Sequence, residues 1–193
     1  MVAVSAPFGL RPIRSGTGGI IRPRGLDNML ASGYNTDILS GQVVRIDPST
    51  RKIVPVTANN VDTIGVFDGV EFTDSTGRRR TLPNWIANTV ATDIIVYVTG
   101  FDDPFMVYEV QADGPVPATK MGDETPLTNF SNGSTVTGYS AETCSATFVG
   151  TTVQSQLRCV GKGLSPDNDW GDAFTVIQVV MARHQQAAAK AAV

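Results

Sequence analysis

Two dense apolar runs separated by a turn dominate the hydrophobic pattern of the chain. Residues 94–98 (IIVYV) are all β-branched or aromatic, and residues 105–110 (FMVYEV) form the second run. The intervening residues 99–104 (TGFDDP) contain glycine, aspartate and proline, which favour a turn. Continuous apolar runs are typical of strands that are covered on both faces. We therefore predict a β-hairpin here, at the centre of a β-sandwich.

Shorter segments with strand character lie on both sides of this pair, and turn residues separate them. Pro55 indicates an edge strand or a bulge, and Gly65 and Gly69 indicate a bent strand. The spacing of strand, turn and strand predicts an all-β fold, an antiparallel β-sandwich. The further predicted strands are 34–39, 42–46, 52–56, 64–73, 78–82, 145–149, 156–160 and 173–181.

The pattern divides the 193 residues into three parts. Residues 1–33 contain Pro12, Pro23 and a glycine-rich stretch, so we predict an extended N-terminal arm that either stays loose or lies on a partner. Residues 34–182 form the sandwich domain, and the Ala-rich residues 183–193 predict a short helical tail that frays. Because all predicted strands follow the arm, we expect the domain to fold without it.

Charge is distributed unevenly between the arm and the rest of the chain. The arm contains four arginines and one aspartate, whereas the whole chain has a net charge of −3. A basic arm on an acidic body favours docking to an acidic protein surface. Nucleic-acid binding usually requires a stronger basic footprint across the domain, so we expect no nucleic-acid partner.

No segment predicts export or membrane insertion. The N-terminus lacks a basic start and a long apolar stretch, and no apolar run approaches ~18 residues. Cys144 and Cys159 are too few for a disulfide framework, so we expect synthesis in a reducing compartment and free thiols. Fourteen residues separate the two cysteines, which places them on or next to neighbouring antiparallel strands.

The sequence contains no complete pattern for catalysis or for metal binding. The single histidine, His184, lies in the polar tail, where we expect exposure to solvent. Residues 138–142 (GYSAE) fail the G-x-S-x-G pattern at its last position, and residues 15–19 fail the dinucleotide fingerprint. Residues 167–172 (DNDWGD) resemble the start of a calcium loop, but Asp172 stands where that loop requires glycine and Gln178 where it requires glutamate, so they predict an Asp/Asn turn instead. We expect no cofactor, no metal and no enzymatic activity, and a small hydrolase is the weakest alternative.

Several short segments point to a family when they are taken together. They are 6–12 (APFGLRP), 31–34 (ASGY) with Ile38, 40–44 (SGQVV), 108–111 (YEVQ) with 113–114 (DG), and 167–172. In order and spacing they resemble the decoration, or cement, proteins of tailed-bacteriophage capsids. The resemblance implies a jelly-roll-like body, made in the host cytoplasm, that sits on the outer surface of the major capsid shell. It also implies a homodimer or homotrimer and no catalysis.

The predicted contacts with the major capsid protein combine the arm with the densest charge cluster. Apolar side chains of the arm would act as anchors and its arginines as polar contacts. The arginine triplet at 78–80 is either a solvated hairpin edge, where charge prevents unwanted pairing, or a capsid contact. The polar residues 118–142 predict a long contact loop. The predicted contact residues are Phe8, Leu10, Arg11, Arg14, Arg22, Arg24, Arg78, Arg79 and Arg80.

A carbohydrate-binding or adhesion module on the virion surface is the alternative function, because β-sandwiches often bind sugars. Sugar sites typically present exposed aromatic rings beside polar side chains. Trp85, Tyr139 and Trp170 are the aromatic residues considered for this role, although they do not cluster in the sequence. The two tryptophans are core or interface residues: exposed tryptophan is enriched at interface hot spots, but burial is the commoner fate.

Overall fold

The computed structural model describes residues 4–59, 61–150 and 153–187, and it consists mainly of antiparallel strands. One sheet contains β1 (Arg11–Arg14), β8 (Val107–Gln111), β9 (Glu124–Thr125), β14 (Leu157–Lys162) and β15 (Val176–Met181). The other contains β2 (Arg24–Asp27), β3 (Val43–Ile46), β4 (Ile53–Pro55), β5 (Gly65–Asp74), β6 (Arg79–Leu82) and β7 (Ala91–Thr99). Smaller elements are β10 (Leu127–Thr128), β11 (Gly133–Ser134), β12 (Tyr139–Ser140), β13 (Thr143–Cys144) and the 3-10 helix η1 (Ala118–Lys120).

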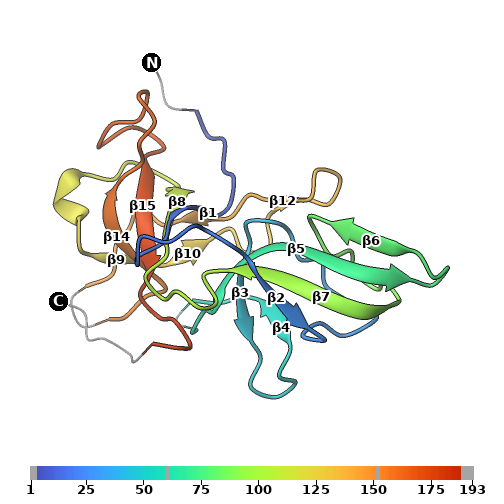
Figure 1. Ribbon diagram of the computed structural model, residues 1–193. Helices are drawn as coiled ribbons and strands as arrows, with labels where there is room; N and C mark the ends of the chain where they lie inside the picture. Colours follow the sequence, from blue (N-terminus) through green and yellow to red (C-terminus); the bar gives the residue numbers. More distant parts are fainter. Residues whose placement is uncertain (1–3, 60, 151–152, 188–193) are drawn as a thin grey trace.

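The two sheets lie side by side in Figure 1, the five-stranded one on the left and the six-stranded one on the right. Their orders are β1-β8-β15-β14-β9 and β2-β7-β5-β3-β4, with β6 paired to β5. The predicted all-β, antiparallel sandwich is confirmed, whereas the jelly-roll-like connectivity stays a prediction. No helix in the described part of the chain is long and apolar enough to cross a membrane.

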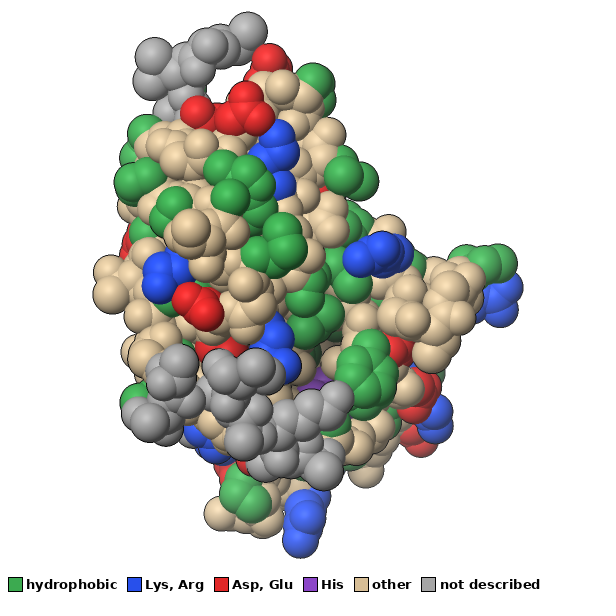
Figure 2. Space-filling view, turned by 90° about the vertical axis from the view of Figure 1, so that its left-hand side faces the viewer, with side chains coloured by type: hydrophobic (Ala, Val, Ile, Leu, Met, Phe, Trp, Pro, Cys, Tyr) green, Lys and Arg blue, Asp and Glu red, His purple; other side chains and the backbone are tan. Residues whose placement is uncertain are grey.

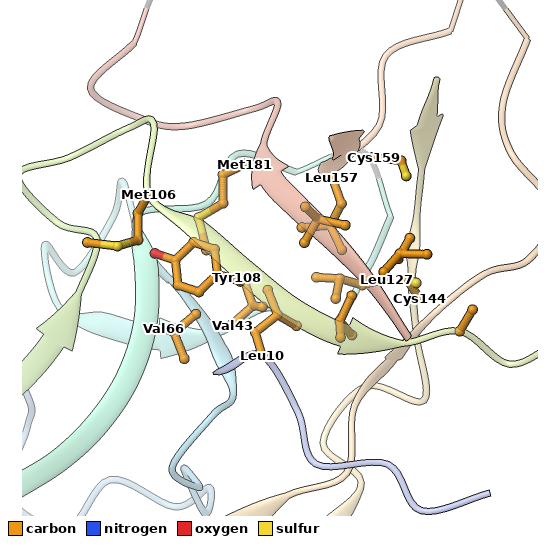
Figure 3. Packing of buried hydrophobic residues seen from close by; sticks show 14 of the residues in the cluster. Leu10, Val43, Val66, Met106, Tyr108, Leu127, Cys144, Leu157, Cys159 and Met181 are labelled. Carbon is orange, nitrogen blue, oxygen red and sulfur yellow. The ribbon is translucent and has the colours of Figure 1, made fainter. Parts of the chain in front are cut away.

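Two hydrophobic clusters cover opposite faces of the six-stranded sheet. Side chains alternate between the faces of a strand, so neighbouring residues enter different clusters. Val43 and Val66 belong to the cluster that also contains Tyr108 of the five-stranded sheet, whereas Val44 and Phe67 belong to the other cluster. Figure 3 shows the first cluster, in which Tyr108, Val43 and Val66 lie close together. The first cluster therefore joins the two sheets.

The predicted central hairpin is wrong, because its two strands belong to different sheets. β7 pairs with β2 and β5, whereas β8 pairs with β1 and β15. Tyr108 fastens the start of β8 to the end of β7, because its hydroxyl donates to the carbonyl of Thr99 at 3.1 Å. At Gly100, with a φ of +88°, a Cβ would lie 1.9 Å from the Tyr108 hydroxyl. Two apolar runs separated by a turn predict two strands, but they do not specify the partners of either strand.

The N-terminal segment is extended, but the prediction that it contains no strand is wrong. β1 pairs with β8 at the edge of one sheet, and β2 pairs with β7 at the edge of the other. Pro12 is tolerated in β1 because an edge strand does not need every backbone N–H. Leu26 and Leu30 are buried in the second cluster. The described part of the predicted arm, residues 4–33, is therefore not separate from the domain, and the domain is not expected to fold without it; residues 1–3 lie outside the described residues.

Several of the shorter predicted strands are confirmed. Residues 42–46 and 52–56 form the β3–β4 hairpin, with Pro55 on an edge strand. Residues 64–73 form β5, whose register shifts twice against β7, as expected for a bent strand. Residues 78–82 contain β6, residues 156–160 overlap β14, and residues 173–181 contain β15.

Three predicted elements are absent from the described residues. Residues 34–39 form only a bridge from Ile38 to Trp85, and the Asp37 side chain accepts from the backbone of Ala87. Residues 145–149 are not a strand, since their amides bond to side chains and to distant carbonyls. Residues 183–187 are not helical, and the rest of the predicted tail, 188–193, lies outside the described residues.

The region 118–142 is not one long loop. It contains η1 and the short strands β9 to β12. Glu124, Leu127 and Glu142 are buried in it, so much of this region contributes to the body rather than to a free contact loop.

Replacing Leu10 by alanine tests whether the N-terminal segment belongs to the core. Leu10 is 1% exposed in the first cluster, so the free energy of unfolding should fall by ~2–5 kcal/mol. Urea unfolding followed by tryptophan fluorescence measures the change. Ile20→Ala, at a position that is 80% exposed, is the matched control and should change stability little. Equal stability of Leu10→Ala and the wild type would contradict this placement of the segment.

Candidate contact surface

The two apolar anchors predicted in the N-terminal segment differ in how deeply they are buried. Leu10 points into the first cluster beside Val43 and Tyr108 (Figure 3), so its prediction as a capsid contact is wrong. Phe8 is half-buried, and the guanidinium of Arg11 lies 4.9 Å from the centre of its ring. The apolar segment around Leu10 is too short to show a periodicity, so the sequence does not predict whether its side chain faces the core or the solvent.

Four of the seven predicted contact arginines are already paired within the chain. Their carboxylate partners lie in strands or turns close by, so these charges are partly satisfied before any partner binds. The pairs are Arg11–Glu109 at 2.5 Å, Arg24–Asp102 at 2.9 Å, Arg79–Glu71 at 2.7 Å and Arg80–Asp74 at 2.8 Å.

The other three contact arginines are exposed and keep their side chains free of partners among the residues described. They are Arg14, Arg22 and Arg78. A free guanidinium can form two parallel hydrogen bonds with a carboxylate, so these three residues are the better candidates for contacts with a partner. Sequence alone does not separate them from Arg11 and Arg24, because the acids that pair with these two arginines lie 98 and 78 residues away.

Two connections that cross between the sheets run against each other. Residues 15–23 lead from β1 to β2, and residues 100–106 lead from β7 to β8. The hydroxyl of Ser15 and the amide of Gly16 donate to one carboxylate oxygen of Asp103, at 2.7 Å and 3.0 Å. Gly16 approaches so closely that a Cβ there would lie 2.4 Å from the Cβ of Phe105.

These connections carry exposed apolar side chains, and two of the free arginines lie on or directly beside the same connections in the chain. Ile20 is 80% exposed and Phe105 is 54% exposed. Arg14 ends β1, immediately before the first connection, and Arg22 lies near the end of that connection. We call Arg14, Ile20, Arg22 and Phe105 the crossover surface.

A groove of about 290 Å³ lies between the N-terminal segment and β12. Phe8 and Tyr139 line it together with the buried Val66, and Tyr139 is 60% exposed. Asp68 contributes an exposed carboxylate, and Thr99 donates to one of its oxygens at 3.2 Å. Phe8 and Tyr139 are far apart in the chain, so their place in one groove could not be predicted from the sequence.

Charge does not form one continuous basic area on the face seen from the side of the five-stranded sheet. Figure 2 shows that basic and acidic side chains are interspersed there among hydrophobic and polar ones, wherever the residues are described. Mixed charge of this kind suits contacts with another protein better than contacts along a nucleic-acid backbone.

The prediction that His184 is a solvated tail residue is wrong. His184 is buried, and its Nε2 lies 2.9 Å from the carbonyl of Ile64 and 3.1 Å from that of Gly100. Both oxygens are acceptors, so Nε2 carries the proton, while Nδ1 accepts from the amide of Gln186 at 3.2 Å. Burial lowers the pKa of His184, although the carbonyl contacts oppose this effect. The neutral ring holds the C-terminal segment against β5 and the β7–β8 connection.

The two cysteines are free, as predicted, but they do not lie on neighbouring strands. Cys144 is in β13, which pairs with β10, and Cys159 is in β14, which pairs with β9 and β15. Both are buried in the first cluster, and burial raises the pKa of both thiols. Protonated, buried thiols act as small apolar side chains in this core.

The predicted Asp/Asn turn at residues 167–172 is confirmed. The buried Asn168 side chain donates to the carbonyls of Gly163 and Val176 and accepts from the amide of Val176 at 2.8 Å. Asp172 accepts from the amide of Asp169 at 2.7 Å. These side chains bond to the backbone, and the described residues contain no group of His, Cys, Asp and Glu that could hold a metal ion.

One buried carboxyl group fastens the β11–β12 region to β3. Glu142 is fully buried and accepts from the amide of Val43 at 2.9 Å. Burial raises the pKa of Glu142 to about 7, although hydrogen bonds from Val43, Ser131 and Gln42 oppose this effect. The sequence placed this residue only in a polar contact loop.

Comparisons with known proteins do not identify a family. No family model matches the sequence, and neither curated proteins nor solved structures gave a match. The resemblance of residues 6–12 and 167–172 to tailed-bacteriophage decoration proteins therefore stays a prediction.

The glutamate at 142 should make stability depend on pH. Between pH 4.5, its ordinary pKa, and pH 7, the folded state binds more protons than the unfolded state. This group's contribution to stability is therefore full below pH 4.5 and is lost as pH rises, by ~3 kcal/mol in all. Glu142→Gln should remove this dependence.

Unfolding free energies of the two proteins, measured from pH 4 to pH 8, test this prediction. His184 acts in the opposite direction, because its lowered pKa costs stability as pH falls below its ordinary value of 6.5. Its contribution is common to both proteins and cancels in their difference. A difference that stays constant across this range would contradict the role assigned to Glu142.

Proposed function

We propose that the chain is a non-enzymatic structural protein that binds the outside of a tailed-bacteriophage capsid and clamps neighbouring subunits of the major capsid protein. The observation that carries the proposal is the crossover surface. It combines free arginines with exposed apolar side chains, Arg14 and Arg22 with Ile20 and Phe105. Arginine and aromatic anchors of this kind are enriched among the residues that dominate protein–protein binding.

The crossover surface is held in place before a partner binds. Asp103 accepts two hydrogen bonds from residues 15 and 16, and Arg24 pairs with Asp102 at 2.9 Å. A surface that is already ordered loses less conformational entropy on binding than a loose arm would. Docking in this proposal therefore uses a rigid edge of the body, where the sequence suggested a segment that a partner must order.

The proposed mechanism is thermodynamic. A protein that binds only the assembled shell stabilises that shell by mass action. Each contact is modest, but a homo-oligomer at a symmetry axis engages several capsid subunits at once, and the contacts then reinforce one another.

Support for a non-enzymatic role comes from the side chains best suited to chemistry. His184 bonds two backbone carbonyls, and Glu142 bonds the amide of Val43. Cys144 and Cys159 are buried in the first cluster. Each of these groups holds the fold together, which is the opposite of the exposed, mutually bonded arrangement that nucleophilic catalysis requires.

A carbohydrate-binding or adhesion module is the second candidate, and one observation favours it. Tyr139 is 60% exposed and shares a groove with Phe8, Arg11 and Asp68, which places aromatic rings beside polar groups. Of the other aromatic residues considered, Trp85 is fully buried and Trp170 packs against the first cluster. Binding of the wild type to a glycan array, lost on Tyr139→Ala, would favour this candidate.

Charge reversal on the crossover surface tests the capsid proposal. Arg14→Glu combined with Arg22→Glu should weaken co-sedimentation with decoration-free capsids about tenfold or more. Each substitution removes a favourable ion pair and introduces a repulsive one, and the two effects on binding add. Rising salt should weaken binding of the wild type more than that of the variant, because exposed charge pairs are screened within ~8–10 Å.

Arg51→Glu is the matched control, since Arg51 is an exposed arginine of the β3–β4 hairpin whose side chain has no partner in the described part of the chain. It should bind capsids as the wild type does. If the Arg51→Glu control and the double variant lose binding equally, the loss is an effect of net charge and not of the crossover surface. Full binding by the double variant would rule out the crossover surface.

A further inference from the structure

We infer that the groove between Phe8 and Tyr139 receives the Arg78 side chain of a second copy of this chain, so that copies join head to tail. The inference extends the proposed function, since it assigns the contact that builds the homo-oligomer. It rests on three features of the described residues: an anionic aromatic groove, a free cation on a rigid turn, and a separation of the two within one copy.

The groove has the chemistry that recognises a guanidinium on an aliphatic stem. One oxygen of Asp68 accepts from the Thr99 hydroxyl at 3.2 Å, and the other has no partner in the part of the chain that is described. Tyr139 and Phe8 line the groove with aromatic rings, a residue type that attracts cations, and Val66 contributes an apolar wall for the methylene groups.

Arg11 also lines the groove, but it does not repel a second cation strongly. Its guanidinium pairs with the buried Glu109 at 2.5 Å and lies over the ring of Phe8. The pair is neutral overall. Asp68 therefore leaves the groove with one uncompensated negative charge.

Arg78 is presented by a turn that is ordered by its own hydrogen bonds. One oxygen of Asp74 accepts from the amides of Thr76 and Arg78, at 2.9 Å and 3.0 Å, and from the Thr76 hydroxyl at 2.6 Å. The other accepts from Arg80 at 2.8 Å. Hydrogen bonds from Thr76 and Arg80 hold the pKa of Asp74 well below its usual range, so the turn stays ordered at acidic pH.

A copy cannot place its own Arg78 in its own groove. Figure 1 shows the β5–β6 turn at the end of the molecule farthest from the five-stranded sheet, while β1 and β12 lie near the middle. The β5–β6 turn of one copy therefore meets the groove of the next copy. A contact between two different surfaces of the same protein closes into a ring or extends into a chain.

The choice of a second copy follows from charge complementarity within this sequence. Arg78 is an exposed contact arginine without a partner among the described residues, and Asp68 is an exposed carboxylate with one free oxygen. A small contact of this kind controls which surfaces meet, and repetition around a ring multiplies its effect.

The experiment is light scattering after size-exclusion chromatography of four proteins from about 1 to 100 µM, a range that brackets weak self-association. The wild type and the control Arg51→Glu should associate alike. Arg78→Glu and Asp68→Arg should each raise the dissociation constant about tenfold or more, because each places like charges together. All substituted side chains are exposed, and unchanged circular dichroism verifies folding.

An equimolar mixture of Arg78→Glu and Asp68→Arg provides the sharper result. Each variant keeps the group that the other has lost, and the two altered groups are again of opposite charge. The mixture should associate more tightly than either variant alone, and a ring with an even number of copies should regain the mass of the wild-type oligomer. Retention of the wild-type mass by either single variant, or a wild type that stays monomeric throughout, would overturn the inference.

Two further outcomes separate this inference from the proposed function. Capsid co-sedimentation that fails for the wild type, together with the mixing result above, would reject the capsid proposal and leave the contact intact. Glycan binding that Asp68→Arg abolishes, with no change in oligomer mass, would assign the groove to sugars and overturn the inference.

Discussion

Both faces of the six-stranded sheet are apolar, and both must be buried. One face packs against the five-stranded sheet through Val43 and Val66. On the other face, Leu26 of the edge strand β2 packs with Leu30 and Trp85. The chain must therefore cross between the sheets repeatedly. Those crossings bring residues 15–23 against residues 100–106 and so create the surface on which the proposed function rests.

Much of the fold was predictable from local pattern, but the partners of each strand were not. The β3–β4 hairpin, the bent β5 and the final strands have the alternation and the turn residues that the pairing requires. The run at residues 94–98 is equally apolar, yet its strand pairs with β2 and β5, while the next strand along the chain, which contains Tyr108, pairs in the other sheet. Strand partners depend on such distant contacts, so a linear pattern cannot specify them.

The sequence predicted which types of residue form the candidate site, but not how those residues are paired or buried. Arginines near the N-terminus were correctly seen as exposed charge, but their pairing depends on Glu109 and Asp102, which lie far away in the sequence. His184 illustrates the same limit, because its polar neighbours suggested solvent while its two carbonyl partners are 84 and 120 residues away. Burial of a single polar side chain leaves no periodic signal.

Hydrogen–deuterium exchange of the capsid-bound protein reports where the capsid covers the chain. If the crossover surface binds the capsid, exchange should become slower at residues 14–22 and 100–106 on binding, with the β3–β4 hairpin unchanged. Protection confined to the β3–β4 hairpin, with the two crossover connections exchanging as fast as in the free protein, would contradict the proposal.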